Sequence, residues 1–319
     1  MKILLIKTSS LGDVVHALPA LTDAAWLVHD LTCDWVVEEN FAEIPRLHPV
    51  VNKVIPIALR RWRKNIFKAL ASGELKKFWK DLRAEKYDYI IDAQGLFFKS
   101  GIIGLLAHGI TCGYDRKSVR EKLAALCYRR KFSVSKEEHA VTRIRKLFAL
   151  SLNYQVPKRA PSYAIDIAKI SGSLEDNWQG KNIVFVHGTS RDDKCWQEEN
   201  WLELARIVTQ SGFSVKIPWG NKKELERAER IAANNQNVEV LSKLNLHELI
   251  QVFLKASAVI AVDTGLGHLS AALDIPTVSL YNNTDPKLCG TVGKHVQHLI
   301  DTNPNVDQVW QAVLSLVKC

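Results

Sequence analysis

Short apolar runs alternate with helical segments along the whole chain, and this alternation limits what the chain can fold into. Glycine or polar turns bound the runs, as is typical of buried parallel strands. We predict strands over Lys2–Lys7, Asp34–Val37, Lys53–Ile57, Tyr87–Asp92, Asn182–His187, Ser214–Trp219, Ala258–Asp263 and Thr277–Tyr281. Helical spacing predicts helices over Val14–Ala25, Trp201–Ser211, Glu224–Asn234, His247–Lys255, His268–Leu273 and Val306–Val317. The pattern indicates an α/β protein with parallel sheets.

The length of the chain, 319 residues, suits two domains of roughly 150 residues each. A polar segment with two prolines interrupts the alternation between residues 154 and 182, and we place the linker there. We therefore predict an N-terminal domain over residues 1–165, a C-terminal domain over 166–305 and a final helix within 306–319.

Charge is divided unevenly between the two halves. The chain has 43 basic and 34 acidic side chains, a net charge of +9. Residues 1–160 hold 28 basic and 16 acidic side chains, net +12, whereas residues 161–319 hold 15 and 18, net −3. We expect an anionic ligand to meet the first half through this field.

The cysteines and the N-terminus indicate a reducing, cytoplasmic location. The six cysteines form no CxxC pair and have no histidines at zinc-binding spacing, which argues against a disulfide framework and a metal knuckle. The apolar run near Met1 is too short for a signal peptide, and the apolar stretch 100–114 is shorter than the roughly 18 residues that span a bilayer. We expect any membrane contact to be peripheral.

The loop after the first strand carries a candidate general base. Open α/β sheets bind ligands beyond the carboxyl ends of their strands, so this loop is a place to seek chemistry. It contains Ser10, Gly12 and Asp13, and Asp13 lies at the start of a helix. Its carboxylate could accept a proton from a hydroxyl, or could only cap the helix. The loop lacks the GxGxxG pattern of dinucleotide-binding proteins, which argues against a dehydrogenase or an epimerase.

Two loops of the second half carry donors and a carboxylate at strand ends. Thr189, Ser190 and Lys194 follow the strand 182–187 and suit a pyrophosphate, which needs hydrogen-bond donors and positive charge. The neighbouring Asp192 and Asp193 fit a solvated turn and could also be proposed as magnesium ligands. In the next loop, Glu224 lies in the first turn of a helix, where a carboxylate also favours the helix dipole.

The loop after the strand 258–263 is suited to a phosphate. Its residues lead from the strand directly into a helix, whose free N–H groups would face a bound phosphate. A tight turn with capping side chains explains the shape of this loop but not its occurrence with the other three. The candidate residues are Asp263, Thr264, Gly265, Leu266 and His268.

Basic and aromatic residues interleave in the first half of the chain. Trp62 lies among Arg60, Arg61, Arg63 and Lys64, and further basic residues, among them Arg120, follow. Such a surface suits the phosphates and bases of a nucleic acid, or the headgroups of anionic lipids.

Four blocks of the sequence resemble the ADP-heptose:lipopolysaccharide heptosyltransferases, a family of glycosyltransferases. The resemblance runs from Met1 to the last helix. Within the family it favours the heptosyltransferase I branch, because of the basic run 60–64 and the loop Arg191–Lys194. The blocks are Thr8–Asp13 with Ala17–Ala20, Asp92–Leu96, His187–Lys194 and Asp263–His268.

The resemblance implies a GT-B fold, in which two Rossmann-like domains face a cleft and the last helix packs back on the N-terminal domain. It implies inverting transfer of heptose from ADP-L-glycero-β-D-manno-heptose to Kdo-lipid A, in inner-core synthesis on the cytoplasmic face of a Gram-negative inner membrane. No cofactor, metal ion or nucleic acid is implied. Two alternatives stay open: heptosyltransferase II, which adds the second heptose, and a basic nucleic-acid-binding protein.

The resemblance also implies roles for the candidate residues. Asp13 matches the base of the family. Donor binding is implied for Thr189, Ser190, Lys194, Glu224, Asp263, Thr264, Gly265, Leu266 and His268, with Glu224 on the ribose and Asp263 on the heptose. Acceptor binding is implied for Ser10, Gly12, Arg60, Arg61, Arg63, Lys64 and Arg120.

Overall fold

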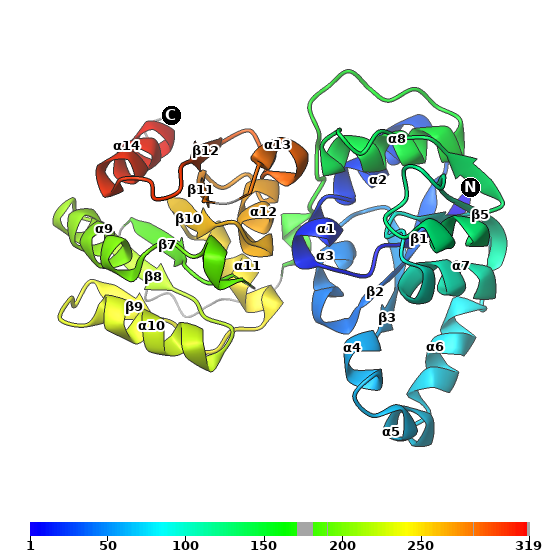
Figure 1. Ribbon diagram of the computed structural model, residues 1–319, viewed down its shortest axis with the longest axis horizontal. Coiled ribbons are helices and arrows are strands. Elements are labelled where there is room, and N and C mark those ends of the chain that lie inside the picture. The colour runs from blue at the N-terminus through cyan, green and yellow to red at the C-terminus, as the bar shows by residue number, and fades with distance from the viewer. Residues whose placement is uncertain (171–180, 190, 283, 318–319) are drawn as a thin grey trace. The chain divides into compact units, whose positions relative to one another are not determined.

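The computed structural model describes residues 1–170, 181–189, 191–282 and 284–317. The chain divides into two compact units, Met1–Ile167 and Ala168–Cys319, which are coloured blue to green and green to red in Figure 1. The division lies near the boundary predicted between residues 165 and 166. Part of the predicted linker, residues 171–180, lies outside the described residues.

The N-terminal unit is built on a parallel sheet with the strand order β3-β2-β1-β4-β5-β6. Its strands are β1 (Lys2–Ile6), β2 (Thr32–Glu38), β3 (Val51–Ile57), β4 (Lys86–Asp92), β5 (His108–Tyr114) and β6 (Arg130–Phe132). Its α-helices are α1 (Leu11–Val15), α2 (Leu18–Leu27), α3 (Glu43–Arg46), α4 (Leu59–Trp62), α5 (Ile66–Ala71), α6 (Glu74–Leu82), α7 (Ile102–Leu106) and α8 (Ala140–Leu152). Short segments of 3₁₀ helix are η1 (Glu39–Phe41), η3 (Lys122–Cys127) and η4 (Ile167–Lys169), and η2 (Phe97–Gly101) is a short π-helix. Helices α4, α5 and α6 form a protrusion of this unit (Figure 1).

The C-terminal unit repeats this topology, with the parallel strand order β12-β11-β10-β7-β8-β9. Its strands are β7 (Asn182–Val186), β8 (Ser214–Ile217), β9 (Val238–Val240), β10 (Ala258–Val262), β11 (Thr277–Tyr281) and β12 (Val296–Ile300). Its helices are η5 (Asp192–Lys194), α9 (Glu198–Gln210), α10 (Lys222–Ala232), α11 (Leu246–Leu254), α12 (Gly265–Ala272), α13 (Pro286–Cys289) and α14 (Val306–Val317). All helices in the described ranges are too short or too polar to cross a membrane.

All eight predicted strands are present, but four further strands occur in the described chain. β5 begins with exposed His108 and Gly109, β6 and β9 are short edge strands, and β12 is a partly exposed edge strand. None of the four therefore has the continuous apolar run of a buried strand. The predicted helix over Val14–Ala25 is divided into α1 and α2. Pro19 lies at the start of α2, where its missing N–H costs no helical hydrogen bond, so it favours a new helix there.

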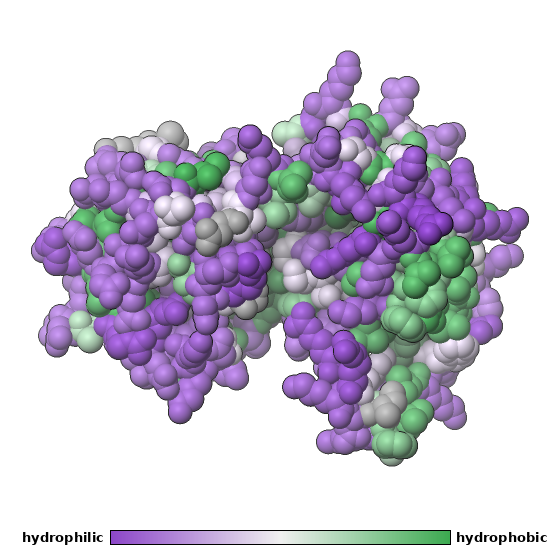
Figure 2. Space-filling model, viewed as in Figure 1, coloured by the Kyte–Doolittle hydropathy of each residue, from purple (hydrophilic) through white to green (hydrophobic). Residues whose placement is uncertain are grey.

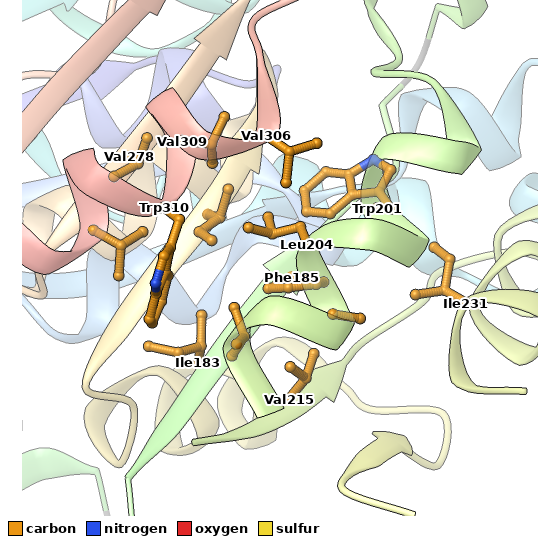
Figure 3. Packing of buried hydrophobic residues seen from close by; sticks show 14 of the residues in the cluster. Ile183, Phe185, Trp201, Leu204, Val215, Ile231, Val278, Val306, Val309 and Trp310 are labelled. Carbon is orange, nitrogen blue, oxygen red and sulfur yellow. The ribbon is translucent and has the colours of Figure 1, made fainter. Parts of the chain in front are cut away.

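The last helix, α14, belongs to the core of the C-terminal unit. Figure 3 shows Val309 and Trp310 pointing into the same apolar layer as Leu204 of α9 and Phe185 of β7. The Trp310 ring also packs edge-on against the ring of Phe213, with centroids 5.5 Å apart. This packing buries the apolar face of the helix in its own unit. The expectation that the helix packs back on the N-terminal domain stays a prediction.

Both sheets reverse their strand order at one place, and this places the ligand sites. The reversal lies between β1 and β4 in the first unit and between β7 and β10 in the second. Loops on the two sides of such a reversal diverge to opposite faces of the sheet and leave a crevice at its carboxyl edge. The loops after β1, β4, β7 and β10 are therefore the expected sites, and they are the loops of the four quoted sequence blocks.

We expect Trp310→Ala to lower the free energy of unfolding of the C-terminal unit by about 3–5 kcal/mol, because Trp310 is only 6% exposed. Thermal unfolding, followed by calorimetry and by circular dichroism, measures the change. The neighbouring Gln311 is exposed, so Gln311→Ala should change the same free energy by less than about 0.5 kcal/mol. Equal stability of both variants would contradict the placement of α14.

Candidate active site

The carboxylate of Asp13 is held from one side and open on the other. Its Oδ1 accepts a hydrogen bond from the ammonium of Lys7 at 3.1 Å, and its Oδ2 accepts from the backbone N–H and the hydroxyl of Ser10 at 2.9 and 3.1 Å. Lys7 is 5% exposed, whereas the Asp13 side chain is 35% exposed. The carboxylate therefore has a fixed orientation and a free approach from solvent.

This environment keeps Asp13 ionised. Burial opposes its charge, but the Lys7 ammonium, the Ser10 N–H group and His16 outweigh burial and lower its pKa to about 2. Asp13 is thus a carboxylate throughout the neutral pH range and can accept a proton. Asp13 also completes a capping box with Ser10, so the capping role that the sequence left open is present together with the exposed carboxylate.

The loop after β4 holds the loop after β1 in place. Gln94 Oε1 accepts hydrogen bonds from the Thr8 and Ser9 N–H groups, both at 3.0 Å, and from the Thr8 hydroxyl at 3.3 Å. The ammonium of Lys7 also donates to the carbonyl of Ala93 at 3.2 Å. Lys7 and Gln94 were given no role by the sequence analysis, although both lie at strand ends, where such a role could have been sought.

A small pocket of the N-terminal unit gathers cations beside this loop. It is lined by Thr8, Ser9, Glu38, Leu59, Arg60, Arg63 and Lys99. Among the residues that the structure describes, the side chains of Arg60, Arg63 and Lys99 have no carboxylate partner within ion-pair distance. The main chain of Arg60 is fixed, because its N–H donates to Glu38 Oε1 at 3.0 Å. Cationic side chains that have no carboxylate partner, on a fixed backbone, suit an anionic ligand. Lys99 is a residue of this pocket that the sequence analysis missed.

The other predicted acceptor residues differ in their surroundings. Arg61 pairs with Glu39 at 2.9 Å and with Glu74 at 2.8 Å, so it braces α4 against η1 and α6. Lys64 is exposed two residues after the end of α4. Arg120 lies against the β4 loop: a Cβ on Gly95 would be 3.5 Å from its backbone nitrogen, and Gly95 has the positive φ of +69°.

In the C-terminal unit, the loops after β7 and β10 are joined by hydrogen bonds. The ammonium of Lys194 donates to Asp263 Oδ2 at 2.6 Å, and the Thr189 hydroxyl donates to the Asp263 carbonyl at 2.9 Å. The structure therefore brings together three predicted donor residues from both sides of the strand reversal. Ser190, also predicted, lies outside the described residues.

Glu224 reaches the same edge of the sheet from α10. Its carboxylate accepts hydrogen bonds from the Gly220 N–H and the Asn221 side-chain amide, both at 2.7 Å. A Cβ at Gly188 would lie 2.5 Å from Glu224 Cδ, so only glycine leaves room for the carboxylate there. Glu224 thus lies directly beside the β7 loop that carries Thr189.

The start of α12 presents backbone donors. Thr264 is the N-cap, but its side chain makes no capping hydrogen bond within the described residues. The first-turn N–H groups of Gly265 and Leu266 are therefore not capped by it and, with the helix dipole, suit a phosphate. His268 is only 7% exposed, which leaves its side chain little surface for a ligand.

The two carboxylates of the β7 loop are paired with basic side chains. Asp193 accepts from Arg191 at 2.5 and 3.0 Å, and Asp192 lies 3.1 Å from the ammonium of Lys223. These pairs reduce the charge that Arg191 offers a ligand. Lys194, which pairs with Asp263, is the partly buried cation of the loop. In the described part of the chain, no group of three or more His, Cys, Asp or Glu side chains is arranged to hold a metal ion.

Proteins of known sequence resemble this chain over most of its length. The lipopolysaccharide heptosyltransferase 1 of Escherichia coli (strain K12) is 48% identical over 295 residues, 92% of this chain and 92% of the relative. The lipopolysaccharide heptosyltransferase 1 of Pseudomonas aeruginosa is 46% identical over 299 residues, 94% of this chain and 83% of the relative.

Solved structures of heptosyltransferases also resemble this chain. E. coli heptosyltransferase WaaC with ADP superimposes with a TM-score of 0.92 at 44% identity, covering 99% of this chain and 100% of that one. The same enzyme with ADP-2-deoxy-2-fluoro heptose gives a TM-score of 0.87 at 44% identity, with 99% of each chain covered. The fold is thus α/β and GT-B-like. The profile of glycosyltransferase family 9 (heptosyltransferase) matches residues 75–314, and the chain belongs to this family of enzymes.

Proposed function

We propose that this protein transfers L-glycero-D-manno-heptose from ADP-heptose to the Kdo of Kdo-lipid A in lipopolysaccharide inner-core synthesis. The observation that carries the proposal is the ionised, solvent-open carboxylate of Asp13 at the strand reversal of the N-terminal unit. The donor is supported by the structures of a similar heptosyltransferase with ADP and with ADP-2-deoxy-2-fluoro heptose, and the acceptor is the one that the family resemblance implies. The heptosyltransferase 1 relatives of E. coli and P. aeruginosa are 48% and 46% identical to this chain, whereas the lipooligosaccharide heptosyltransferase 2 of Haemophilus influenzae is 28% identical over 30% of it. The higher identity favours the first heptose over the second.

In this proposal Asp13 is the general base of one displacement. The hydroxyl oxygen of Kdo attacks the anomeric carbon of heptose, the bond from that carbon to the phosphate oxygen of ADP breaks, and the configuration inverts. A carboxylate with a pKa of about 2 is too weak a base to deprotonate a free hydroxyl. It accepts the proton as the new bond forms, because the attacking oxygen then becomes strongly acidic.

The C-terminal unit stabilises the leaving ADP. Lys194 supplies a positive charge that it shares with Asp263, and Thr189 and Ser190 supply hydroxyl donors, that of Thr189 by turning from the Asp263 carbonyl. The start of α12, from Thr264 to Leu266, supplies backbone donors and a dipole. Glu224 binds the ribose, and Asp263 binds hydroxyls of the heptose. These groups provide the neutralisation that a divalent metal would otherwise supply, so the proposal includes no metal or cofactor.

The N-terminal unit binds the anionic acceptor. Arg60 and Arg63 bind its phosphate and carboxylate groups together with Lys99 of the same pocket. Lys64 and Arg120 bind further anionic groups of the acceptor. Ser10 and Gly12 contact the acceptor beside Asp13. Arg61 acts through its ion pairs, which keep α4 in place. Because the acceptor is a lipid, the protein works on the cytoplasmic face of the inner membrane as a peripheral protein.

We expect Asp13→Asn to lower kcat roughly 10²–10⁴-fold while ADP-heptose binds as before, because the amide cannot take the proton. Steady-state kinetics and calorimetry measure the two effects. Asp30→Asn removes an exposed carboxylate of the same unit and should change neither. Since protonation of Asp13 begins only as pH falls toward 2, kcat/KM should show no Asp13-dependent acid limb between pH 5 and 7. Near-normal turnover of Asp13→Asn would reduce Asp13 to a helix cap.

We expect Lys194→Ala to weaken ADP binding roughly 10- to 100-fold, because a charge-assisted hydrogen bond contributes about 1.5–3 kcal/mol. Added Mg²⁺ should not restore the loss, and excess EDTA should leave the unaltered protein fully active. Lys222→Ala removes an exposed ammonium of the same unit and serves as the matched control. Loss of activity in EDTA and recovery with Mg²⁺ would refute the metal-free mechanism.

A further inference from the structure

We propose that a defined face of the N-terminal unit docks the protein on an anionic lipid bilayer. This docking face has two apolar parts, the η3 patch and the α5 tip. The η3 patch consists of Phe98, Leu105, Leu123 and Leu126, and the α5 tip consists of Phe67, Leu70 and Trp79. The inference rests on the proposed function, because it identifies the surface by which the protein reaches a lipid acceptor.

The η3 patch is formed by elements that pack on one another. Phe98 lies in η2, a π-helical turn, and Leu105 lies in α7, which follows η2 without a break. Leu123 and Leu126 are three residues apart in η3, a spacing at which side chains of a 3₁₀ helix align. Gly101 brings η3 close to this segment, because a Cβ there would lie 2.9 Å from Cys127 Sγ.

These side chains are unusually exposed for their type. Phe98 is 76%, Leu105 58%, Leu123 60% and Leu126 73% exposed, and in the α5 tip Phe67 is 81% exposed. Figure 2 shows hydrophobic residues gathered over the region of α7 and again at the end of the protrusion, both on the visible face. Contiguous apolar surface of this kind indicates an interaction site.

Cations accompany both apolar parts. Lys99 follows Phe98, Lys122 precedes Leu123, and the helices α5 and α6 carry Lys68, Lys76, Lys77 and Lys80. The carboxylate of the nearby Glu121 is already hydrogen-bonded, because it accepts the N–H of Phe97 at 2.7 Å. Apolar side chains flanked by cations match the interface of an anionic bilayer, where acyl chains lie beneath negative headgroups.

This composition favours a bilayer over other occupants. A second copy of the chain would bring two sets of like charges together, which opposes association. A nucleic acid would pair with the cations but would leave the exposed leucines in water. The docking face also shares elements with the acceptor pocket: Lys99 of η2 lines it beside Phe98, and Arg63 lines it just before α5. A lipid acceptor could therefore be bound while its acyl chains stay in the bilayer.

The test is flotation of the whole protein with vesicles of phosphatidylethanolamine and phosphatidylglycerol. The double variant Leu105→Glu/Leu126→Glu should bind these vesicles roughly tenfold or more weakly, because it removes apolar burial and adds negative charge. Ile300→Glu alters an equally exposed apolar residue of the C-terminal unit and should bind as the unaltered protein does. Vesicles of phosphatidylcholine alone should bind all three proteins weakly.

A second measurement separates this inference from the proposed function. With a Kdo acceptor that lacks acyl chains, the double variant should retain the kcat and KM of the unaltered protein. With Kdo-lipid A in vesicles, its turnover should fall. No transfer by the unaltered protein would refute the proposed function without bearing on vesicle binding. Unchanged flotation of the double variant would refute the docking face. A dimer in solution that the double variant converts to monomers would assign the face to a second copy.

Discussion

The buried ammonium of Lys7 is the interaction on which the N-terminal site depends. It lies at the end of β1, donates to a carbonyl of the β4 loop and pairs with Asp13. A charge so far from water needs partners, and here they come from both sides of the strand reversal. The same ammonium therefore connects the two loops and keeps Asp13 ionised with one oriented face open to solvent. Gln94 adds neutral hydrogen bonds to the same connection.

The two units use one topology for different electrostatic tasks. In the C-terminal unit the charged groups of the site are paired internally, as Lys194 with Asp263 and Asp193 with Arg191. A ligand that binds there must share these charged side chains with their present partners. Such sharing suits a nucleotide, which has several anionic and hydroxyl groups. In the N-terminal unit Arg60 and Arg63 line their pocket without carboxylate partners in the described residues. That arrangement leaves net positive charge for an acceptor, in agreement with the excess of basic residues in the first half.

The sequence predicted the buried strands because their apolar runs are continuous, and it placed Asp13, Thr189, Lys194 and Asp263 at strand ends, where the structure has them. It could not predict edge strands such as β9, whose three residues carry no such run. Nor could a run of basic residues reveal that Arg61 is paired whereas Arg63 is not, because pairing depends on Glu39 and Glu74 from other elements. The η3 patch was missed for the same reason: Phe98 and Leu126 lie in separate elements, η2 and η3, which are brought together only by folding.

The most direct test of the account is the anomeric configuration of the product. The protein is incubated with ADP-L-glycero-β-D-manno-heptose and Kdo-lipid A, the product is analysed by mass spectrometry, and the new linkage is assigned by NMR spectroscopy. A single displacement assisted by Asp13 predicts one added heptose in the α configuration, opposite to that of the donor. A β-linked heptose, or release of ADP without transfer to the Kdo, would contradict it.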